Sequence, residues 1–166
     1  MDLPILVLCL LVTPVYVHSA VQVVESGPGT VRPGGSIRLT CKVTGDSIKN
    51  VWWEWIRQAP GKGLEWVGQI DWDAKKWRTL YASSLQSRTT LTADDSRNEY
   101  YLAMSSLTAA DSATYYCARK GELGRFEYWG KGTSLVVTSE SPKAPSLFPL
   151  IPSGDNSGTA DIAIGC

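Results

Sequence analysis

Residues 36–43 read SIRLTCKV, a stretch in which polar and apolar side chains alternate without interruption. Successive side chains of an extended strand point to opposite faces, so the apolar half of this stretch faces one way and the polar half the other. Residues 90–92 and 101–104 alternate in the same way, and clusters of Gly, Pro, Asp, Asn and Ser separate such segments from 20 to 139. Because no segment there keeps a helical period, the sequence predicts an all-β antiparallel sandwich.

The overall composition narrows the class of partner. The chain has 166 residues, with 16 Lys plus Arg balanced by 16 Asp plus Glu. This length allows one domain of ordinary size and part of a second. The balanced charge provides no field that would attract nucleic acid or an anionic membrane. Seven Trp and seven Tyr stand against two Phe, and Trp and Tyr suit half-buried surfaces that also form hydrogen bonds. We therefore expect a binding protein that recognises its partner locally.

The first 19 residues are typical of a secretory signal. An apolar run spans 5–12, and the small side chain of Ser19 suits cleavage before Ala20. A membrane anchor is the alternative, because no charged residue occurs in the range 3–24. Prolines and polar residues interrupt that range, however, so we expect 1–19 to be a signal peptide and the mature chain to be extracellular.

The cysteines and histidine limit the possible chemistry. Cys9 lies in the expected signal, which leaves Cys41, Cys117 and Cys166 in the mature chain. Secretion permits a disulfide among them. The mature chain contains no C-x-x-C pair, and the single histidine, His18, belongs to the signal. We therefore expect no metal site and no other cofactor.

Four residues carry a resemblance to a known fold. Cys41, Trp55 and Cys117 stand in the order and approximate spacing of the immunoglobulin fold, and Tyr115 precedes the second Cys by two residues, as the tyrosine corner of that fold does. The resemblance implies a variable-type β-sandwich of two antiparallel sheets over 20–139. It also implies a disulfide between Cys41 and Cys117 that joins the sheets and packs on a buried Trp55.

Longer motifs narrow this resemblance to the antibody heavy-chain variable region. They run from VQVVESGPG through WWEWIRQAPGKGLEWVG and LTAADSATYYCAR to WGKGTSLVVTS. Light chains and T-cell receptors of this superfamily have Phe in place of the Trp of WGxG, so Trp129 indicates a heavy chain. The resemblance further implies a buried structural ion pair between Arg88 and Asp111. It also implies a bridge from Arg119 to Glu127 that braces the third hypervariable loop.

Two binding surfaces follow from the same resemblance. The first would face an immunoglobulin light chain and combines apolar side chains with one amide, namely Ile56, Gln58, Leu64, Trp66, Tyr116 and Trp129. The second would consist of three hypervariable loops at 45–52, 70–79 and 118–128, which would bind an antigen that the sequence does not identify. Its candidate contacts are mostly charged or aromatic: Asp46, Lys49, Asn50, Trp52, Asp71, Trp72, Asp73, Lys75, Lys76, Trp77, Arg78, Lys120, Glu122, Leu123 and Arg125.

The tryptophans of these loops have different expected roles. Trp72 or Trp77 in the second loop is the expected aromatic anchor for antigen, and Arg125 or Lys76 is the expected charged contact. The alternative is that Trp72 and Trp77 pack on the framework beneath a solvated turn. Trp53, beside the first loop, is expected to point into the core.

The C-terminal part resembles the start of a second domain. Residues 140–144 look like a linker, and 145–166 resemble the N-terminal fragment of a first constant domain, most like the mu class. Cys166 would be the first sheet-bridging cysteine of that domain. Ser153 departs from the mu pattern, in which a cysteine that bonds the light chain often lies near this position. A chain of this family is secreted or forms part of a B-cell receptor.

Two other classes of protein are the alternatives. An enzyme is disfavoured because the mature chain has no histidine base and no nucleophile motif such as G-x-S-x-G. An invariant immunoglobulin-like receptor or adhesion module would share the fold without gene rearrangement. The WGKG motif and the constant-type segment that follows it favour an antibody chain, whose role would be antigen recognition.

Overall fold

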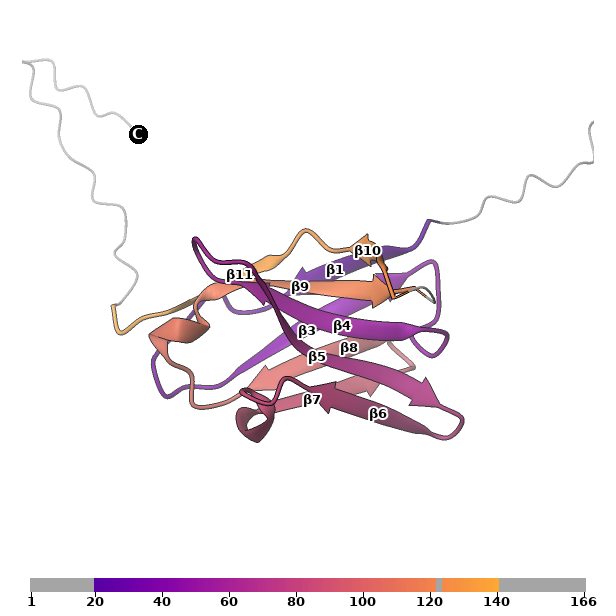
Figure 1. Ribbon diagram of the computed structural model, residues 1–166, viewed down its shortest axis with the longest axis horizontal. Helices are drawn as coiled ribbons and strands as arrows, with labels where there is room; N and C mark the ends of the chain where they lie inside the picture. Colours follow the sequence, from indigo (N-terminus) through magenta and orange to yellow (C-terminus); the bar gives the residue numbers. More distant parts are fainter. Residues whose placement is uncertain (1–19, 122–123, 141–166) are drawn as a thin grey trace, which may run out of the picture.

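The computed structural model describes residues 20–121 and 124–140, which form two β-sheets packed face to face (Figure 1). The expected all-β sandwich is therefore confirmed. The signal at 1–19, residues 141–144 of the linker and the constant-type segment at 145–166 lie outside the described residues, as do Glu122 and Leu123. Over the described ranges, no helix is long and apolar enough to cross a membrane.

The first sheet has four antiparallel strands. Their order is β1 (Gln22–Ser26), β3 (Ile37–Thr44), β8 (Glu99–Met104) and β7 (Thr89–Asp94). The alternation at 36–43 is realised in β3, because its apolar side chains are all buried and its polar ones are not. The stretches at 90–92 and 101–104 lie in β7 and β8, as predicted.

The second sheet has seven strands. Their order is β2 (Thr30–Val31), β11 (Thr133–Val137), β9 (Ala113–Lys120), β4 (Trp52–Gln58), β5 (Leu64–Asp73) and β6 (Lys76–Tyr81), and β10 (Phe126–Trp129) also pairs with β9. The Pro-Gly stretch at 58–63 joins β4 to β5, as predicted. Two short 3₁₀ helices, η1 (Gln86–Arg88) and η2 (Ala109–Asp111), complete the fold.

One strand pairing differs from the expected pair of antiparallel sheets. β2 runs parallel to β11, whereas the other pairings are antiparallel. The Gly-Pro-Gly stretch at 27–29 ends β1, because Pro28 has no backbone N–H for the ladder. The chain then crosses from the first sheet to the second, where β2 lies beside the last strand.

The core between the sheets contains the predicted disulfide and aromatic residues. Cys41 of β3 and Cys117 of β9 are joined across the sheets, and their sequence separation is 76 residues. A bridge over such a span stabilises the fold by about 4 kcal/mol, mainly by constraining the unfolded chain. Trp55 is fully buried and meets the Tyr100 ring edge-on, with ring centroids 5.7 Å apart.

The strand end after Trp129 is fixed by a carboxylate from β1. Glu25 Oε1 accepts a hydrogen bond from the Cys117 N–H at 2.8 Å, and its Oε2 accepts one from the Gly132 N–H at 3.1 Å. A Cβ atom at Gly130 would lie 1.9 Å from Glu25 Oε1. A larger residue at position 130 would therefore displace the group that holds β1, β9 and the end of β10 together.

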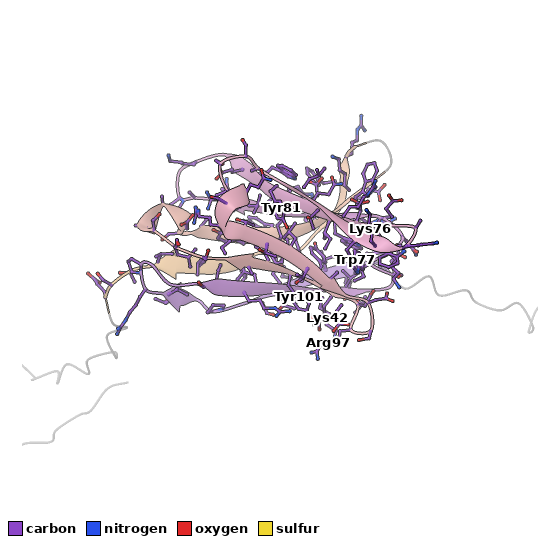
Figure 2. The ribbon with its side chains drawn as sticks, turned by 90° about the horizontal axis from the view of Figure 1, so that it is seen from below. Lys42, Lys76, Trp77, Tyr81, Arg97 and Tyr101 are labelled. Atoms are coloured by element: carbon purple, nitrogen blue, oxygen red, sulfur yellow. A yellow bond between two sulfur atoms is a disulfide. The ribbon has the colours of Figure 1, made fainter. Side chains whose placement is uncertain are left out.

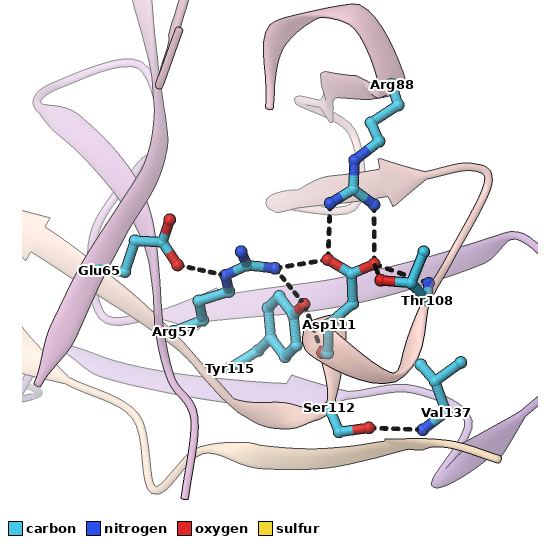
Figure 3. Close-up of polar contacts among 8 residues, drawn as sticks. All are labelled: Arg57, Glu65, Arg88, Thr108, Asp111, Ser112, Tyr115 and Val137. Atoms are coloured by element: carbon cyan, nitrogen blue, oxygen red, sulfur yellow. Dashed lines mark hydrogen bonds and ion pairs between the residues drawn. The ribbon is translucent and has the colours of Figure 1, made fainter. Parts of the chain in front are cut away.

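The predicted ion pair between Arg88 and Asp111 lies among the contacts of Figure 3, at the end of the sandwich that carries η1 and η2. Arg88 Nη1 donates to Asp111 Oδ2 at 2.8 Å and Nη2 donates to Oδ1 at 2.6 Å, a bidentate contact. A second arginine joins them, because Arg57 Nη1 donates to Asp111 Oδ1 at 2.8 Å. Glu65 accepts from Arg57 Nε at 2.8 Å. The expected pair is thus part of a larger charged cluster.

Tyr115 links this cluster to β9. Its hydroxyl donates to the backbone O of Asp111 at 3.0 Å and accepts from Arg57 Nη1 at 3.2 Å; the first of these is the kind of contact that a tyrosine corner makes. Burial by itself would raise the pKa of Asp111. The hydrogen bonds from Arg88, the Thr108 N–H and Arg57 outweigh burial and hold that pKa well below its ordinary value. Asp111 is therefore ionised in the folded chain at neutral pH.

Candidate functional site

The three segments expected to form hypervariable loops meet at one end of the sandwich, opposite η1 and η2 (Figure 1). In the ladder between β4 and β9, Trp52 at the end of the first loop pairs with Lys120 near the start of the third. The Lys49 Nζ of the first loop lies 4.7 Å from the centroid of the Trp72 ring in the second. These contacts show that the three segments form one continuous surface.

The second segment is mostly strand, which corrects its description as a loop over 70–79. Asp71 pairs with Arg78, Trp72 with Trp77 and Asp73 with Lys76, so the ladder of β5 and β6 continues almost to the tip. Ala74 adopts a φ of 52° at the tip, a left-handed conformation suited to a tight turn. The alternating side chains of this hairpin therefore point to opposite faces rather than forming one cluster.

Asp71 supports a neighbouring arginine and is itself hidden. Its side chain is 6% exposed, and its Oδ2 accepts from Arg78 Nε at 3.0 Å and from Nη2 at 2.6 Å. Asp73 lies 3.2 Å from Arg78 Nη1. The expectation that Asp71 contacts antigen directly does not fit this burial. Arg78, Lys75 and Lys76 present the charge of the hairpin to solvent.

Trp72 and Trp77 pack on each other, and Trp77 packs on the framework. Their rings meet edge-on with centroids 5.2 Å apart, and Trp77 also contacts the apolar core. Figure 2 shows Trp77 beside Lys76 at the loop end of β6 and Tyr81 farther along the strand. Trp52 is more open, with 44% of its surface exposed. Trp53 points into the core as expected, and its Nε1 donates to the Ile48 carbonyl at 3.0 Å.

Trp52 stands between two hollows of the loop end. A hollow of about 700 Å³ lies between the first and third segments, and its lining includes Trp52, Arg125 and Phe126. A second of about 500 Å³ lies over the hairpin, and its lining includes Trp52, Arg78 and Leu80. Each hollow thus combines an exposed aromatic ring with at least one arginine, a mixture that favours ligand anchoring.

The base of the third segment is held differently from the expected bridge. Arg119 Nε lies 3.4 Å from Glu127 Oε2 without a hydrogen bond between them. Arg119 Nη1 instead donates to Asp46 Oδ2 at 2.9 Å. A Cβ atom at Gly121 would lie 2.1 Å from Glu127 Oε1, so the longer Glu side chain folds across this glycine. The expected brace is therefore present only as the weaker of two ion pairs.

The outer face of the second sheet carries the side chains expected to meet a light chain. Leu64 is 58% exposed, and Trp66 and Trp129 are also exposed. The ring of Trp129 lies edge-on to those of Tyr116 and Phe126, with centroids 6.2 and 4.7 Å away. This face carries an apolar patch that extends from Leu64, opposite Gln58, to Trp129 at the stem of the third segment.

Two members of the expected set contribute less to this face. Ile56 is only 3% exposed, because it lies mid-strand between its partners Tyr116 and Trp66 on the neighbouring strands. The expectation that Ile56 offers contact surface is therefore not met in this chain by itself. Gln58 is exposed, but its Nε2 already donates to the Lys62 carbonyl at 3.0 Å.

Sequence reasoning missed two side chains of these surfaces, Glu54 and Phe126, and one of the charged cluster, Arg57. Glu54 lies on the outer face with 2% exposure, and its Oε1 is 3.3 Å from Lys120 Nζ. Burial raises the pKa of Glu54, and the charge of Lys120 opposes that rise. Arg57 belongs to the charged cluster, and Phe126 extends the apolar patch. The alternation in WWEWIRQ would have placed Glu54 on the face of Ile56 and Gln58. Nothing in the neighbouring sequence indicates that Lys120 is its partner.

Over the described ranges, no three His, Cys, Asp or Glu side chains gather as a metal ion would need. The available chemistry is that of contact surfaces, namely an apolar patch next to a loop end rich in aromatic rings and charges.

Comparison with known proteins gives a consistent result. The immunoglobulin V-set domain family matches residues 24–138. The chain is 48% identical over 125 residues to Ig heavy chain V region MOPC 315 of Mus musculus, covering 74% of this chain and 89% of that one. It is 49% identical over 116 residues to Ig heavy chain V region XIG14 of Xenopus laevis, covering 69% and 84%. It is 42% identical over 142 residues to the immunoglobulin delta heavy chain of Homo sapiens, covering 78% of this chain and 27% of that longer one.

The chain therefore belongs to the immunoglobulin V-set family. Its likeness to heavy-chain V regions over most of its length makes it, more narrowly, an antibody heavy-chain variable domain, as Trp129 had indicated. These are non-enzymatic families. The mu-class likeness, the signal peptide and the constant-type segment stay predictions.

Proposed function

We propose that this variable domain forms the heavy-chain half of an antigen-binding site. It pairs with an immunoglobulin light chain through the outer face of the second sheet, and the adjoining loop end recognises antigen. The observation that carries the proposal is the apolar patch of Leu64, Trp66 and Trp129, which lies exposed on the outer face and reaches the stem of the third loop at Trp129. Unpartnered patches of this kind mark protein interfaces, because water solvates them poorly.

The patch stands on a rigid backbone, which suits pairing with a partner of the same sandwich type. Leu64 and Trp66 lie on β5, which is paired with β4 and β6, and Trp129 lies on β10, which is paired with β9. Rigid aromatic side chains bury much area at a modest cost in side-chain entropy, which suits a stable heterodimer. The relatives are heavy-chain V regions, and the light chain is the partner that this class of protein implies.

A charge placed in the patch tests the pairing. Replacing Leu64 with Arg should weaken association with a co-expressed light chain, because the new charge must lose its water at the interface. Leu80→Arg is the matched control, since Leu80 has the same 58% exposure but lies on β6, away from the patch. Size-exclusion chromatography measures the heterodimer, and circular dichroism checks that each variant is folded. An unchanged heterodimer with Leu64→Arg would show that this face is not the light-chain contact.

The antigen surface is the loop end around Trp52. Its two flanking hollows hold Arg125 on one side and Arg78 on the other. Aromatic and arginine side chains dominate the energetics of such surfaces. We propose Trp52 as the central anchor, with Trp72 and Trp77 acting partly as support from beneath.

The remaining segments complete the proposed context. Residues 1–19 direct secretion, and 145–166 begin a first constant domain, which would make the protein a secreted antibody or part of a B-cell receptor. Antigen recognition by such a chain belongs to adaptive humoral immunity. The light chain and the antigen are the partners, and no nucleic acid is implied.

A further inference from the structure

Two neighbouring cations begin the third loop and point to opposite faces of the second sheet. Arg119 Nη1 donates to Asp46 Oδ2 at 2.9 Å, and each of these side chains is 19% exposed. Lys120 Nζ lies 3.3 Å from Glu54 Oε1 on the outer face. The N-terminal stem of the third loop therefore meets one carboxylate on each side of the sheet.

Asp46 is fixed within the first loop before it meets Arg119. Its Oδ1 accepts hydrogen bonds from the Ser47 N–H and from Asn50 Nδ2, both at 2.7 Å. Its backbone O accepts a hydrogen bond from Asn98 Nδ2, also at 2.7 Å. A carboxylate held in this way loses little further freedom when it binds an arginine, so Asp46 is a preorganised acceptor.

Glu54 is fixed by its strand. It lies within β4, where the ladder pairs it with Ala118 of β9 and Gln69 of β5. Its carboxylate is nearly inaccessible to water, and a buried charge requires a counter-charge. Lys120 supplies that charge, so the Lys120 side chain is tied to the rigid centre of the sheet.

The ion pair between Arg119 and Glu127, which crosses the stem of the loop, is weaker than either of these contacts. Arg119 Nε and Glu127 Oε2 are 3.4 Å apart without a hydrogen bond, and the Glu127 side chain is 45% exposed. An exposed pair of this kind contributes little, because water screens the charges. The C-terminal side of the stem thus meets Arg119 through the backbone ladder and the Tyr128 ring, whose centroid lies 5.4 Å from the guanidinium carbon, but not through a strong ion pair.

We infer that Asp46 and Glu54 are positioning residues for the third loop. They fasten its N-terminal stem to the first loop and to β4 with ion pairs that supplement the backbone ladder between β9 and β10, in place of a strong ion pair across the stem. The role of the loop in antigen recognition rests on the proposed function, whereas the fastening is a property of the free chain. The first and third loops then act as one unit, and a substitution at Asp46 alters the third loop without any contact between Asp46 and antigen.

Amide hydrogen exchange in the free chain tests this inference. The Gly121 N–H donates to the Arg125 carbonyl at 2.8 Å and the Gly124 N–H donates to the Gly121 carbonyl at 3.0 Å, so both amides report on the base of the loop. Asp46→Asn and Glu54→Gln should each speed their exchange about tenfold, because each removes a charge-assisted contact from the stem. The Leu102 amide of β8 should stay unchanged.

The matched control is Glu127→Gln, which removes an equal charge from the other side of the stem. It should change the two glycine amides less than either positioning variant does. Asp46→Glu restores the charge and should recover part of the protection, which a purely steric role of Asp46 would not explain. Equal or larger acceleration by Glu127→Gln, or no acceleration by Asp46→Asn, would overturn the inference.

A second measurement uses the unaltered chain, so it can be made even if a variant unfolds. Nitrogen-15 NMR of the Arg119 guanidinium should show two separate Nη resonances, because the bond to Asp46 hinders rotation. A single averaged resonance in the unaltered chain would overturn the inference even if Asp46→Asn proved too unstable to study. Neither measurement uses antigen or a light chain, so a failure of the proposed function leaves both results interpretable.

Discussion

Replacing Asp111 with Asn keeps the shape of the side chain but removes its charge. Among such substitutions in this domain, it should be one of the most destabilising. Asp111 is 1% exposed and accepts five hydrogen bonds, two from Arg88, one from Arg57 and two from Thr108. The amide keeps one acceptor oxygen but turns its NH₂ toward an arginine. Two positive groups at this end of the sandwich would then face each other without the carboxylate between them.

The magnitude follows from the burial of the groups involved. Removing one partner of a buried ion pair costs about 3–5 kcal/mol. The lower end applies here, because Arg57 keeps its contact with Glu65 and the Arg88 side chain is 23% exposed. A domain of about 120 residues has an unfolding entropy of about 0.25 kcal/mol/K, so a loss of about 3 kcal/mol lowers Tm by roughly 12 °C.

Calorimetry and urea unfolding would measure this loss. Asp95→Asn is the control, because the ion pair of Asp95 with Lys49 is exposed and its removal should hardly change Tm. A decrease in Tm of less than about 4 °C for Asp111→Asn, or one no larger than for the control, would refute the reasoning, since about 1 kcal/mol is the scale of an ordinary neutral hydrogen bond.

Further predictions concern pH, the loops and the N-terminus. The native pKa of Asp111 is depressed, so its contribution to stability is complete above the unfolded-state pKa of about 3.9 and declines as the pH falls toward the native value; Asp111→Asn should flatten the acid side of a pH–stability curve. With a cognate antigen and light chain, Trp52→Ala should cost about 2 kcal/mol of affinity or more. Trp77→Ala should lower Tm as well as affinity, because Trp77 packs on the core. An unchanged affinity for Trp52→Ala would show that the aromatic anchor is another residue. Gly121→Ala should displace the Glu127 carboxylate and shift nearby amide resonances, while unchanged resonances would contradict the close approach. N-terminal sequencing of secreted protein should begin at Ala20, and a retained leader would refute the signal.

Much of the fold was predictable because its signals are local. The alternation in 36–43 defines which side chains enter the core, and the structure buries the apolar ones. Cys41, Trp55, Cys117 and Tyr115 lie as the resemblance implied. Such features depend on the period of a strand or on the spacing of a motif, which a sequence displays directly.

The charged contacts were less predictable because their partners are distant in the chain. Arg57 and Asp111 are 54 residues apart, and Arg119 and Asp46 are 73 apart. A polar residue at an inward or outward position of a strand reveals its direction but not the group that neutralises it. For the same reason the resemblance, which implied a bridge from Arg119 to Glu127, did not reveal the shorter contact with Asp46, and the sequence did not reveal that Arg78 covers Asp71.

The second loop shows a further limit of local reasoning. Its aromatic and charged residues appear together in the sequence, which favours one mixed contact surface. The ladder between β5 and β6 separates them instead, because Trp72 and Trp77 pair on one face while Asp71 and Arg78 pair on the other. Strand register, which depends on pairing between segments, decides this outcome.

The most direct test of the proposed heavy-chain role is hydroxyl-radical footprinting of the tryptophans with and without a light chain. Trp66, Trp129 and Trp52 have similar exposure in the free chain, at 37%, 39% and 44%, so they start with similar reactivity. Binding a light chain should protect Trp66 and Trp129 strongly and leave Trp52 reactive for antigen. Protection of Trp52 alone, or no protection of Trp66 and Trp129, would contradict the account.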